Sequence, residues 1–454
     1  MSDSADTELI ELVAQEQRGL RGILVAGFSA TFVVVAMSVA LGVYYFFVAQ
    51  ALAADSERLE RQAFDTRIMS DNLADQISDQ DARLRRTYAE MLDATDTGVA
   101  GTSDVEALDV ASAYLKLGVR SLTGEKQIER TIQQAEPSTS RAVLAAILAL
   151  MEWERSGTDI VAGDLGLPGR LDQARQGLIA GLDTPETRTL AQTGLAWIAF
   201  ETASSPRSNY AVEDCEAVFD ATARIGPLDT IGLQPLYWRG QCARKLGRVE
   251  EALRSYSLAV QSGQSIDVDE IDSLVERDAL LTLELNAFHG LGTVLIASEN
   301  VPDSDALSAA RALAGDVCEP GAISEGSERT RLMHACLQKA ISIRRRLRQT
   351  DNQVSGSGEN LSFVFLIDDD YQRAAENTAA VERTGLFAWN ELLRATVARE
   401  LGNSAAETDA RRNVSFFNSR QFNACEIRKL LKPAHFELAL DILLEEHPDL
   451  AIDC

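Results

Sequence analysis

The chain has 454 residues and a formal net charge of −26. One compact core does not extend over that length, so the sequence predicts several domains or an elongated protein. The acidic balance disfavours nucleic acid as a partner, because phosphate contacts need clustered Lys and Arg.

A short polar tail (1–21) precedes a long apolar segment (22–54) without a charged residue. A helix of that length reaches about 50 Å, which exceeds the ~30 Å hydrocarbon core of a bilayer. We therefore predict one transmembrane helix with its membrane part near 23–47. Tyr44 and Tyr45 suit one membrane interface.

The end of the apolar segment also resembles a signal-peptide cleavage site, with small residues at Ala51 and Ala53. The acidic tail before it and the length of the apolar run favour an uncleaved anchor. Both interpretations place the remainder of the chain across the membrane from an N-terminus that stays inside. Small residues spaced by four, at Gly22, Ala26 and Ala30, would allow spans to associate, although this spacing is common by chance.

Residues 55–103 are predicted to form a helical stalk followed by a linker. From 55 to about 93 the sequence is rich in charged residues, Gln and Leu and lacks Pro and Gly, which is typical of an exposed helix. Polar residues interrupt its heptad seam, so a stalk is favoured over a stable coiled coil. Homo-oligomerisation through the span or the stalk stays an open alternative.

The remaining segment (104–454) has helical spacing almost throughout, with short breaks rich in Gly, Pro, Ser and Asp. The best candidate for a strand is LSFVFLI (361–367). We predict an all-α fold for this part of the chain.

The stretch from Leu233 to Val260 resembles one unit of the tetratricopeptide repeat (TPR), a 34-residue helix-turn-helix. With Leu233 at position 1, the positions that define the unit are filled by Gly240, Ala243, Leu246, Gly247, Ala252, Tyr256 and Ala259. Small residues where the two helices touch alternate with larger ones that fill the space, and Gly247 frees the turn. Arg239 departs from the usual leucine at position 7, and Ala243 stands where the family has an aromatic residue.

Weaker matches occur elsewhere, at 113–118, 191–197, 355–388 and 398–403. The unit at 355–388 assigns LSFVFLI to a first helix rather than to a strand. The resemblance implies an α-solenoid that buries a continuous core by stacking its repeats. The last segment, 426–454, is expected to be a capping helix.

In the TPR family the inner face of each first helix binds extended or helical peptides. The corresponding positions here are Gln234, Tyr237, Gln241, Arg244 and Lys245. The resemblance thus implies a protein partner, and Tyr237, Arg244 and Lys245 suit an acidic or carboxylate-bearing segment. In the unit at 355–388 the same face offers Phe363, Leu366 and Ile367, which are either an apolar groove or core contacts.

Six cysteines follow the apolar segment: Cys215, Cys242, Cys318, Cys336, Cys425 and Cys454. Pairing them consecutively joins residues about one helix apart, so we predict three disulfides in an extracytoplasmic space. The alternative is six unrelated thiols in a cytosolic protein. The sequence contains no CxxC motif, so a zinc, haem or redox-motif site is not predicted.

Phosphate-loop, dinucleotide-binding, metalloprotease and nucleophile-elbow motifs do not occur in the sequence. The four histidines lack ligand spacing, and we interpret Asp368, Asp369 and Asp370 as a polar turn. We therefore expect no enzyme, cofactor or metal. The preferred hypothesis is a TPR scaffold in the bacterial inner membrane that binds protein partners with a periplasmic domain, in translocation or envelope assembly.

Two alternatives remain open. One is a membrane signalling or regulatory subunit whose repeats face the cytoplasm. The other, more remote, is a hydrolase that uses the three consecutive aspartates.

Overall fold

The computed structural model describes most of the chain after residue 103. The described residues there are 104–117, 122–134, 138–156, 167–205, 208–268, 271, 274–318, 327–348, 356–382, 387–422 and 424–450; before them they are 16, 19, 37, 38, 41, 43–48, 50 and 58–69. The chain divides into two units, Met1–Met69 and Ser70–Cys454.

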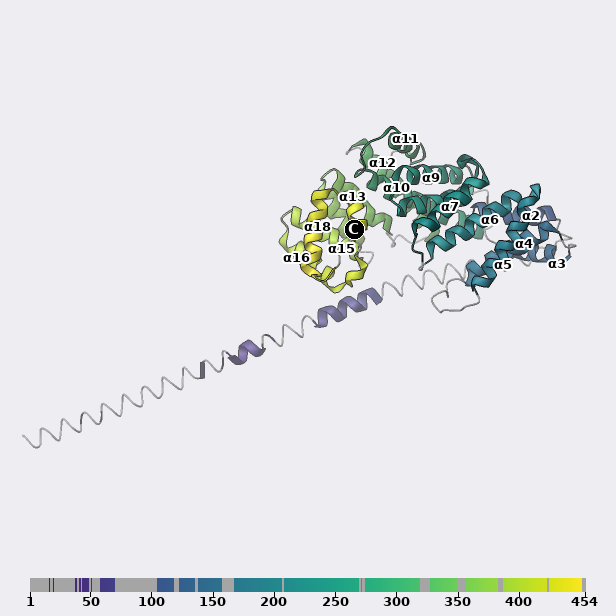
Figure 1. The fold of residues 1–454 in the computed structure, drawn as a ribbon. Helices are drawn as coiled ribbons and strands as arrows, with labels where there is room; N and C mark the ends of the chain where they lie inside the picture. The colour runs from purple at the N-terminus through teal and green to yellow at the C-terminus, as the bar shows by residue number, and fades with distance from the viewer. Residues whose placement is uncertain are drawn as a thin grey trace, which may run out of the picture. The chain divides into compact units, whose positions relative to one another are not determined.

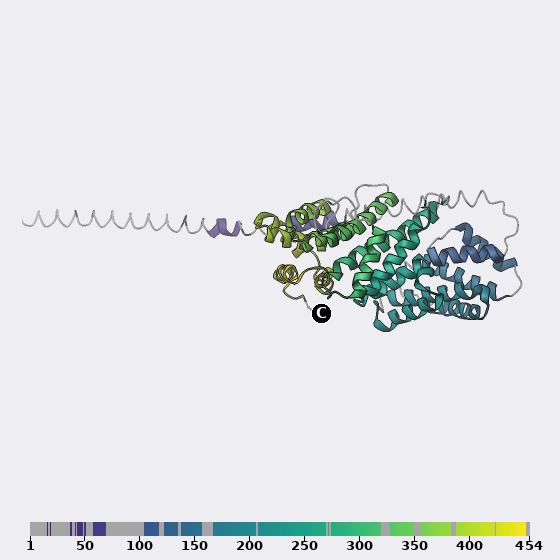
Figure 2. The ribbon, with the colours of Figure 1, turned by 90° about the horizontal axis from the view of Figure 1, so that it is seen from above.

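The regular structure of the described residues is entirely helical, which confirms the predicted all-α class. The helices of the second unit (Figures 1 and 2) are α2 (Asp104–Leu117), α3 (Leu122–Gln134), α4 (Thr139–Ser156), α5 (Leu167–Ala180), η2 (Gly181–Asp183), α6 (Pro185–Ser204), α7 (Val212–Ile225), η3 (Leu228–Thr230), α8 (Leu233–Lys245), α9 (Val249–Gln264), α10 (Leu274–Ser298), α11 (Asp305–Cys318), α12 (Glu328–Arg348), α13 (Gly356–Ile367), α14 (Tyr371–Glu382), α15 (Ala388–Glu400), α16 (Ser404–Phe416), η5 (Ser419–Gln421), α17 (Ala424–Leu430) and α18 (Pro433–Glu446). LSFVFLI lies in α13, so the alternative of a strand there is wrong.

Successive helices of this unit pack as hairpins, and neighbouring hairpins pack on one another. The closest pairs within hairpins are α4 with α5, α6 with α7, α8 with α9, α13 with α14, and α15 with α16. Helix α10 connects several of them, since it packs on α8, α9, α12, α13 and α17. This central position explains why α10 is largely apolar, since Leu280, Phe288, Leu291 and Leu295 are all buried.

Three of the hairpins share one turn geometry. In each, a backbone N–H donates to the carbonyl five residues earlier: Arg248 to Ala243, Asp370 to Phe365, and Asn403 to Ala398, at 2.8–2.9 Å. The residue before each donor has a left-handed backbone, with φ of +72° at Gly247, +57° at Asp369 and +65° at Gly402. This hydrogen bond ends a helix by satisfying a carbonyl that lacks a helical partner. The recurrence coincides with the predicted registers at 233–260, 355–388 and 398–403.

The ring of Tyr256 is held between two glycines on neighbouring helices. It is completely buried. A Cβ at Gly240 of α8 would lie 2.9 Å from its Cδ1, and a Cβ at Gly290 of α10 would lie 2.5 Å from its Cζ. The absence of side chains at both glycines therefore lets α8, α9 and α10 close around one tyrosine, which is the packing expected for Gly240 and Tyr256.

Arg239, which departs from the TPR pattern, connects α8 to the preceding and following helices. Its guanidinium donates to the carbonyl of Phe219 at 3.3 Å and to Thr222 Oγ1 at 3.2 Å in α7. It also pairs with Glu251 of α9 and lies 4.9 Å above the Phe219 ring. An arginine replaces the usual apolar contact here because α7 and α9 supply acceptors for it.

The predicted transmembrane segment and the first part of the predicted stalk belong to the first unit, while residues 70–103 belong to the second. Most of the residues in these predicted segments lie outside the described ones. The described residues within 22–54 are helical, and their large apolar side chains, including Tyr44 and Phe46, are exposed. Residues 58–69 are also helical. Among the described helices, the segment Arg277–Ser298 is long and apolar enough to cross a membrane, but 72% of its apolar window is buried inside the protein. It is therefore better explained as a core helix.

The cysteines differ from the prediction in one pair. Cys318 and Cys336 form a disulfide with a Cα–Cα distance of 5.0 Å, as predicted. Cys425 is disulfide-bonded, while its predicted partner, Cys454, lies outside the described residues. Cys215 and Cys242 are free thiols, so the predicted disulfide between them is absent from this structure.

Cys215 and Cys242 nevertheless meet, because α7 and α8 pack together. Both thiols are fully buried, and each affects the pKa of the other. Sequence spacing predicted that they would be neighbours, but spacing does not determine oxidation state.

We expect Cys215 and Cys242 to resist alkylation by iodoacetamide in the native protein and to react rapidly once the protein is unfolded. Burial raises the pKa of both thiols, which disfavours the reactive thiolate, and also blocks the reagent. Mass spectrometry of a time course measures both states. Rapid native labelling, or recovery of a peptide with Cys215 bonded to Cys242, would contradict this expectation.

Candidate functional site

Three of the predicted partner-binding residues form a connected polar row along α8. Gln241 donates from Nε2 to the Tyr237 hydroxyl at 2.6 Å and accepts from Arg244 Nη2 at 3.1 Å. The spacing of four and three residues places all three side chains on one face of the helix. All three are partly exposed, so the row is reachable by a partner.

The other two predicted residues are arranged differently. Lys245 turns to the neighbouring hairpin, where its Nζ lies 5.8 Å from the centre of the Tyr210 ring. Gln234 is partly buried, and its Oε1 is buried without a hydrogen bond among the described residues. The structure thus brings Tyr237, Gln241 and Arg244 together and leaves Lys245 outside the row.

Arg244 acts electrostatically on three tyrosine hydroxyls. Its charge acts on Tyr210, Tyr237 and Tyr256, which come from three neighbouring parts of the fold. Burial is the main cause that raises the pKa of Tyr210 to about 12, and it also raises the pKa values of Tyr237 and Tyr256. The three hydroxyls therefore stay neutral at physiological pH, where they can donate hydrogen bonds but do not neutralise Arg244.

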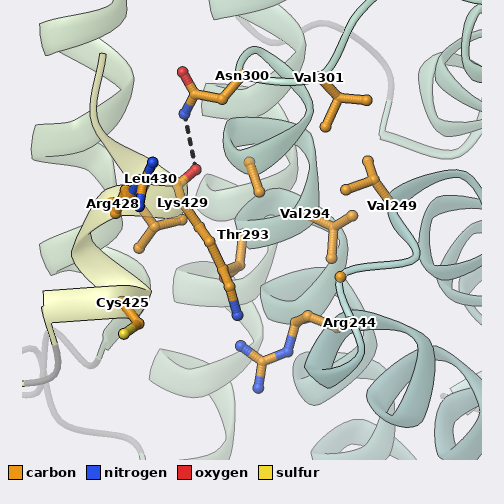
Figure 3. Close-up of a pocket in the computed structure, with 12 residues that line it drawn as sticks. Arg244, Val249, Thr293, Val294, Asn300, Val301, Cys425, Arg428, Lys429 and Leu430 are labelled. Atoms are coloured by element: carbon orange, nitrogen blue, oxygen red, sulfur yellow. Dashed lines mark hydrogen bonds between the residues drawn. The ribbon is translucent and has the colours of Figure 1, made fainter. Parts of the chain in front are cut away.

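A cavity of about 380 Å³ lies next to this row, between α8, α10 and α17 (Figure 3). Three of its lining residues are cationic: Arg244, Arg428 and Lys429. Figure 3 shows Arg244 and Lys429 extending toward one another from opposite sides. None of the described residues that line the cavity is acidic, although the chain has 69 acidic and 43 basic residues.

Apolar side chains form much of the wall. They are Val249, Val294, Ala297, Val301 and Leu430. Thr293 and Val294 are buried at depth, while Gly247, Asn300 and Arg428 are exposed at the rim. The cavity therefore runs from solvent to a partly apolar interior.

Hydrogen bonds hold the two sides of the cavity together. Asn300, just after α10, donates from Nδ2 to the carbonyl of Lys429 at 2.9 Å (Figure 3) and to that of Leu431 at 3.3 Å. Asn360 of α13 donates to Thr293 Oγ1 at 2.8 Å. The two bonds of Asn300 fix α17 against the end of α10, which positions Arg428 and Lys429, and the bond of Asn360 joins α13 to α10.

The apolar face predicted at 355–388 is mostly core. Phe363 and Leu366 are about 99% buried, and Ile367 is partly buried. Of the two alternatives left by the sequence, core contacts are correct for Phe363 and Leu366.

The three consecutive aspartates each contact different partners. Asp368 accepts from the backbone N–H of Ser327 at 3.1 Å, and Asp370 caps α14 by accepting from the N–H of Arg373 at 3.1 Å. Asp369 lies 3.1 Å from Lys432 Nζ and 3.3 Å from His435 Nε2. The described residues contain no group of His, Cys, Asp and Glu arranged to hold a metal ion. This geometry favours the predicted polar turn.

His289 in α10 lies in the electrostatic field of Arg244 and Arg344. Its Nδ1 is 2.8 Å from Ser357 Oγ. Burial, followed by the charges of Arg244 and Arg344, lowers its pKa to about 4. The imidazole is therefore neutral at physiological pH.

We expect the free energy of unfolding to decrease as the pH falls from about 6.5 to about 4. In this window a histidine of the unfolded chain takes up a proton while folded His289 stays neutral, so protons favour unfolding. The contribution of His289 is roughly 3 kcal/mol, present in full above the window and lost below it. Denaturant titration of wild type and His289→Asn across this range measures it, because carboxylates titrate equally in both. An identical slope in the two proteins would contradict the assignment.

Comparison with known proteins adds no family: no protein-family model and no curated protein matches this chain. The fold and site therefore define the molecule as an all-helical protein of packed hairpins with a cation-lined cavity. The TPR resemblance stays a prediction.

Sequence reasoning found Arg244 but missed Arg428, Lys429 and Asn300. Arg428 and Lys429 belong to a short helix near the C-terminus that the sequence treats as a cap. Asn300 follows α10, and 129 residues separate it from Lys429. No local pattern indicates that these two parts of the chain meet.

Proposed function

We propose that this protein is a membrane-anchored TPR-like scaffold that binds protein partners through the row Tyr237, Gln241 and Arg244 and the adjoining cavity. The observation that carries the proposal is the position of Arg244. It is partly buried on the helix face that binds peptides in the TPR family, and no described carboxylate forms an ion pair with it.

The anchor is the uncharged segment 22–54. Its part near 23–47 is long enough for one membrane span, and the exposed apolar side chains of the described residues support a lipid environment. One anchored chain with a large helical domain suits recruitment of partners at a membrane surface. Assistance to translocation or envelope assembly is the role we propose, by analogy of architecture.

The disulfide between Cys318 and Cys336 supports an oxidising compartment, and thus a periplasmic domain of a bacterial inner-membrane protein. The free thiols Cys215 and Cys242 are the one observation that favours the alternative, a regulatory subunit whose helices face the cytoplasm. Protease treatment of intact cells and of spheroplasts separates the two: digestion in spheroplasts supports the periplasmic domain, and protection until lysis supports the cytoplasmic one.

The test of partner binding is site-specific photocrosslinking in cells. A crosslinking amino acid replaces Tyr237, and a matched control places it at Arg254, an exposed position on α9 that does not line the cavity. We expect mass spectrometry to identify a protein captured from position 237 and absent from position 254. Equal capture at the two positions, or none above a variant limited to the span, would contradict the proposal.

A further inference from the structure

The cavity between α8, α10 and α17 concentrates positive charge in an acidic protein. Arg244, Arg428 and Lys429 come from two helices far apart in sequence, yet they line one space without an acidic residue among its described lining. Like charges that converge in a partly buried site repel one another, and an anion between them removes that repulsion. The arrangement therefore indicates an anionic ligand.

Arg244 differs from several other partly buried arginines in its partners. Arg239, Arg311 and Arg394 each form an ion pair with a carboxylate of the chain. Arg244 forms no ion pair with a described residue, and its Nε is buried without a hydrogen bond. A guanidinium offers five donors in a planar fork that matches a carboxylate. A ligand carboxylate in the cavity would accept hydrogen bonds from the terminal nitrogens of Arg244, one of which also donates to Gln241.

The apolar wall and the size of the cavity restrict the ligand further. A free phosphate requires polar donors around most of its surface, whereas Val249, Val294 and Leu430 offer contacts to hydrocarbon. About 380 Å³ is near the lower end of ligand pockets, which span roughly 300–1,000 Å³, and suits one or two residues. The exposed rim at Gly247 and Asn300 leaves room for a chain to continue into solvent.

We propose that the cavity binds the C-terminal carboxylate of a partner peptide whose last side chains are apolar. Arg244 and Lys429 hold the carboxylate, and the valines and Leu430 contact the final side chains. This inference rests on the proposed function, since it names the part of the partner that the site recognises.

The test uses the full-length protein in detergent and a fluorescent peptide, Gly-Ser-Ala-Ile-Val, with a free carboxylate. The control peptide has the same sequence and a C-terminal amide. Fluorescence anisotropy is expected to show binding of the acid and at least about tenfold weaker binding of the amide, because hydrogen bonds to a charged group are lost. Equal affinity of acid and amide would overturn the proposal.

Two competitors identify the source of the anion. Hexanoate supplies a carboxylate and hydrocarbon without a peptide, and inorganic phosphate supplies charge alone. We expect both to displace the peptide only at concentrations far above its Kd. Displacement by hexanoate at concentrations comparable to that Kd would assign the cavity to a free carboxylic acid, and such displacement by phosphate would assign it to a phosphate ligand. Either result overturns the peptide proposal.

Two variants connect binding to the cavity. Arg244→Met and Lys429→Met remove charge and keep length, and each is expected to weaken binding of the peptide acid by at least about tenfold. The matched control is Lys245→Met, which removes a cation next to Arg244 that does not line the cavity. Circular dichroism verifies folding of each variant, and Lys429, which is exposed, provides the result if Arg244→Met fails to fold. Unchanged affinity in Lys429→Met would overturn the proposal.

The two proposals fail separately. If the peptide acid does not bind but a protein is still crosslinked from position 237, the carboxylate proposal is wrong and the scaffold proposal is supported. If no protein is crosslinked from position 237 but the peptide acid binds specifically, the cavity is a carboxylate-binding site and the proposed scaffold function is wrong.

Discussion

Replacing Tyr256 with alanine is expected to lower the free energy of unfolding by about 3–5 kcal/mol, the range for removal of a large buried aromatic side chain. The ring is completely buried and contacts Gly240 of α8 and Gly290 of α10, so its removal leaves a cavity where three helices meet. Backbones already in close contact through two glycines have little room to collapse into that space. Denaturant unfolding followed by circular dichroism measures the loss.

Two glycine variants provide the matched control for this interpretation. Gly290→Ala in α10 places a methyl group against the Tyr256 ring, and we expect it to destabilise the protein by about 1–3 kcal/mol. Gly315→Ala in α11 meets no atom within 4 Å. Helix propensity is then the only large effect, and a gain of up to about 1 kcal/mol is expected. Equal effects of the two substitutions would show that close packing around Tyr256 does not control stability here.

The sequence predicted the features of this fold that depend on short segments. Gly247 and the residues around it specify a turn because a left-handed backbone suits glycine, and the turn forms where predicted. The register of the repeat unit at 355–388 also predicted that Asp370 lies at the turn before α14, although no glycine marks that turn. Gly240 and Tyr256 meet as expected because they lie in adjacent helices of one hairpin, where spacing determines contact.

The features that the sequence did not predict depend on distant segments or on chemical state. The Gly290 contact with Tyr256 and the bond between Asn300 and Lys429 both require knowledge of how hairpins stack. The role of Arg239 depends on acceptors in α7, which no motif encodes. The sequence separation of Cys215 and Cys242 predicted that the two residues lie close together, whereas their oxidation state depends on the redox environment.

Removing the disulfide between Cys318 and Cys336 is expected to lower the free energy of unfolding by about 3 kcal/mol, the value that loop-closure entropy gives for a loop of this length. The bond joins the end of α11 to α12 across 18 residues, and its loss allows the unfolded chain many more conformations. Unfolding of a double variant, Cys318→Ala with Cys336→Ala, measures the effect against wild type.

The matched control for the disulfide is Cys215→Ala with Cys242→Ala, which removes two buried sulfur atoms that form no covalent bond. Dithiothreitol should destabilise wild type and this control more than the Cys318/Cys336 variant, because that variant already lacks the bond between α11 and α12 and retains only the disulfide of Cys425. If the reductant has the same effect on all three proteins, this disulfide does not stabilise the fold. The proposal of an oxidising compartment would then lose its main structural support. A disulfide that does not stabilise the protein is weak evidence for the compartment in which the domain lies.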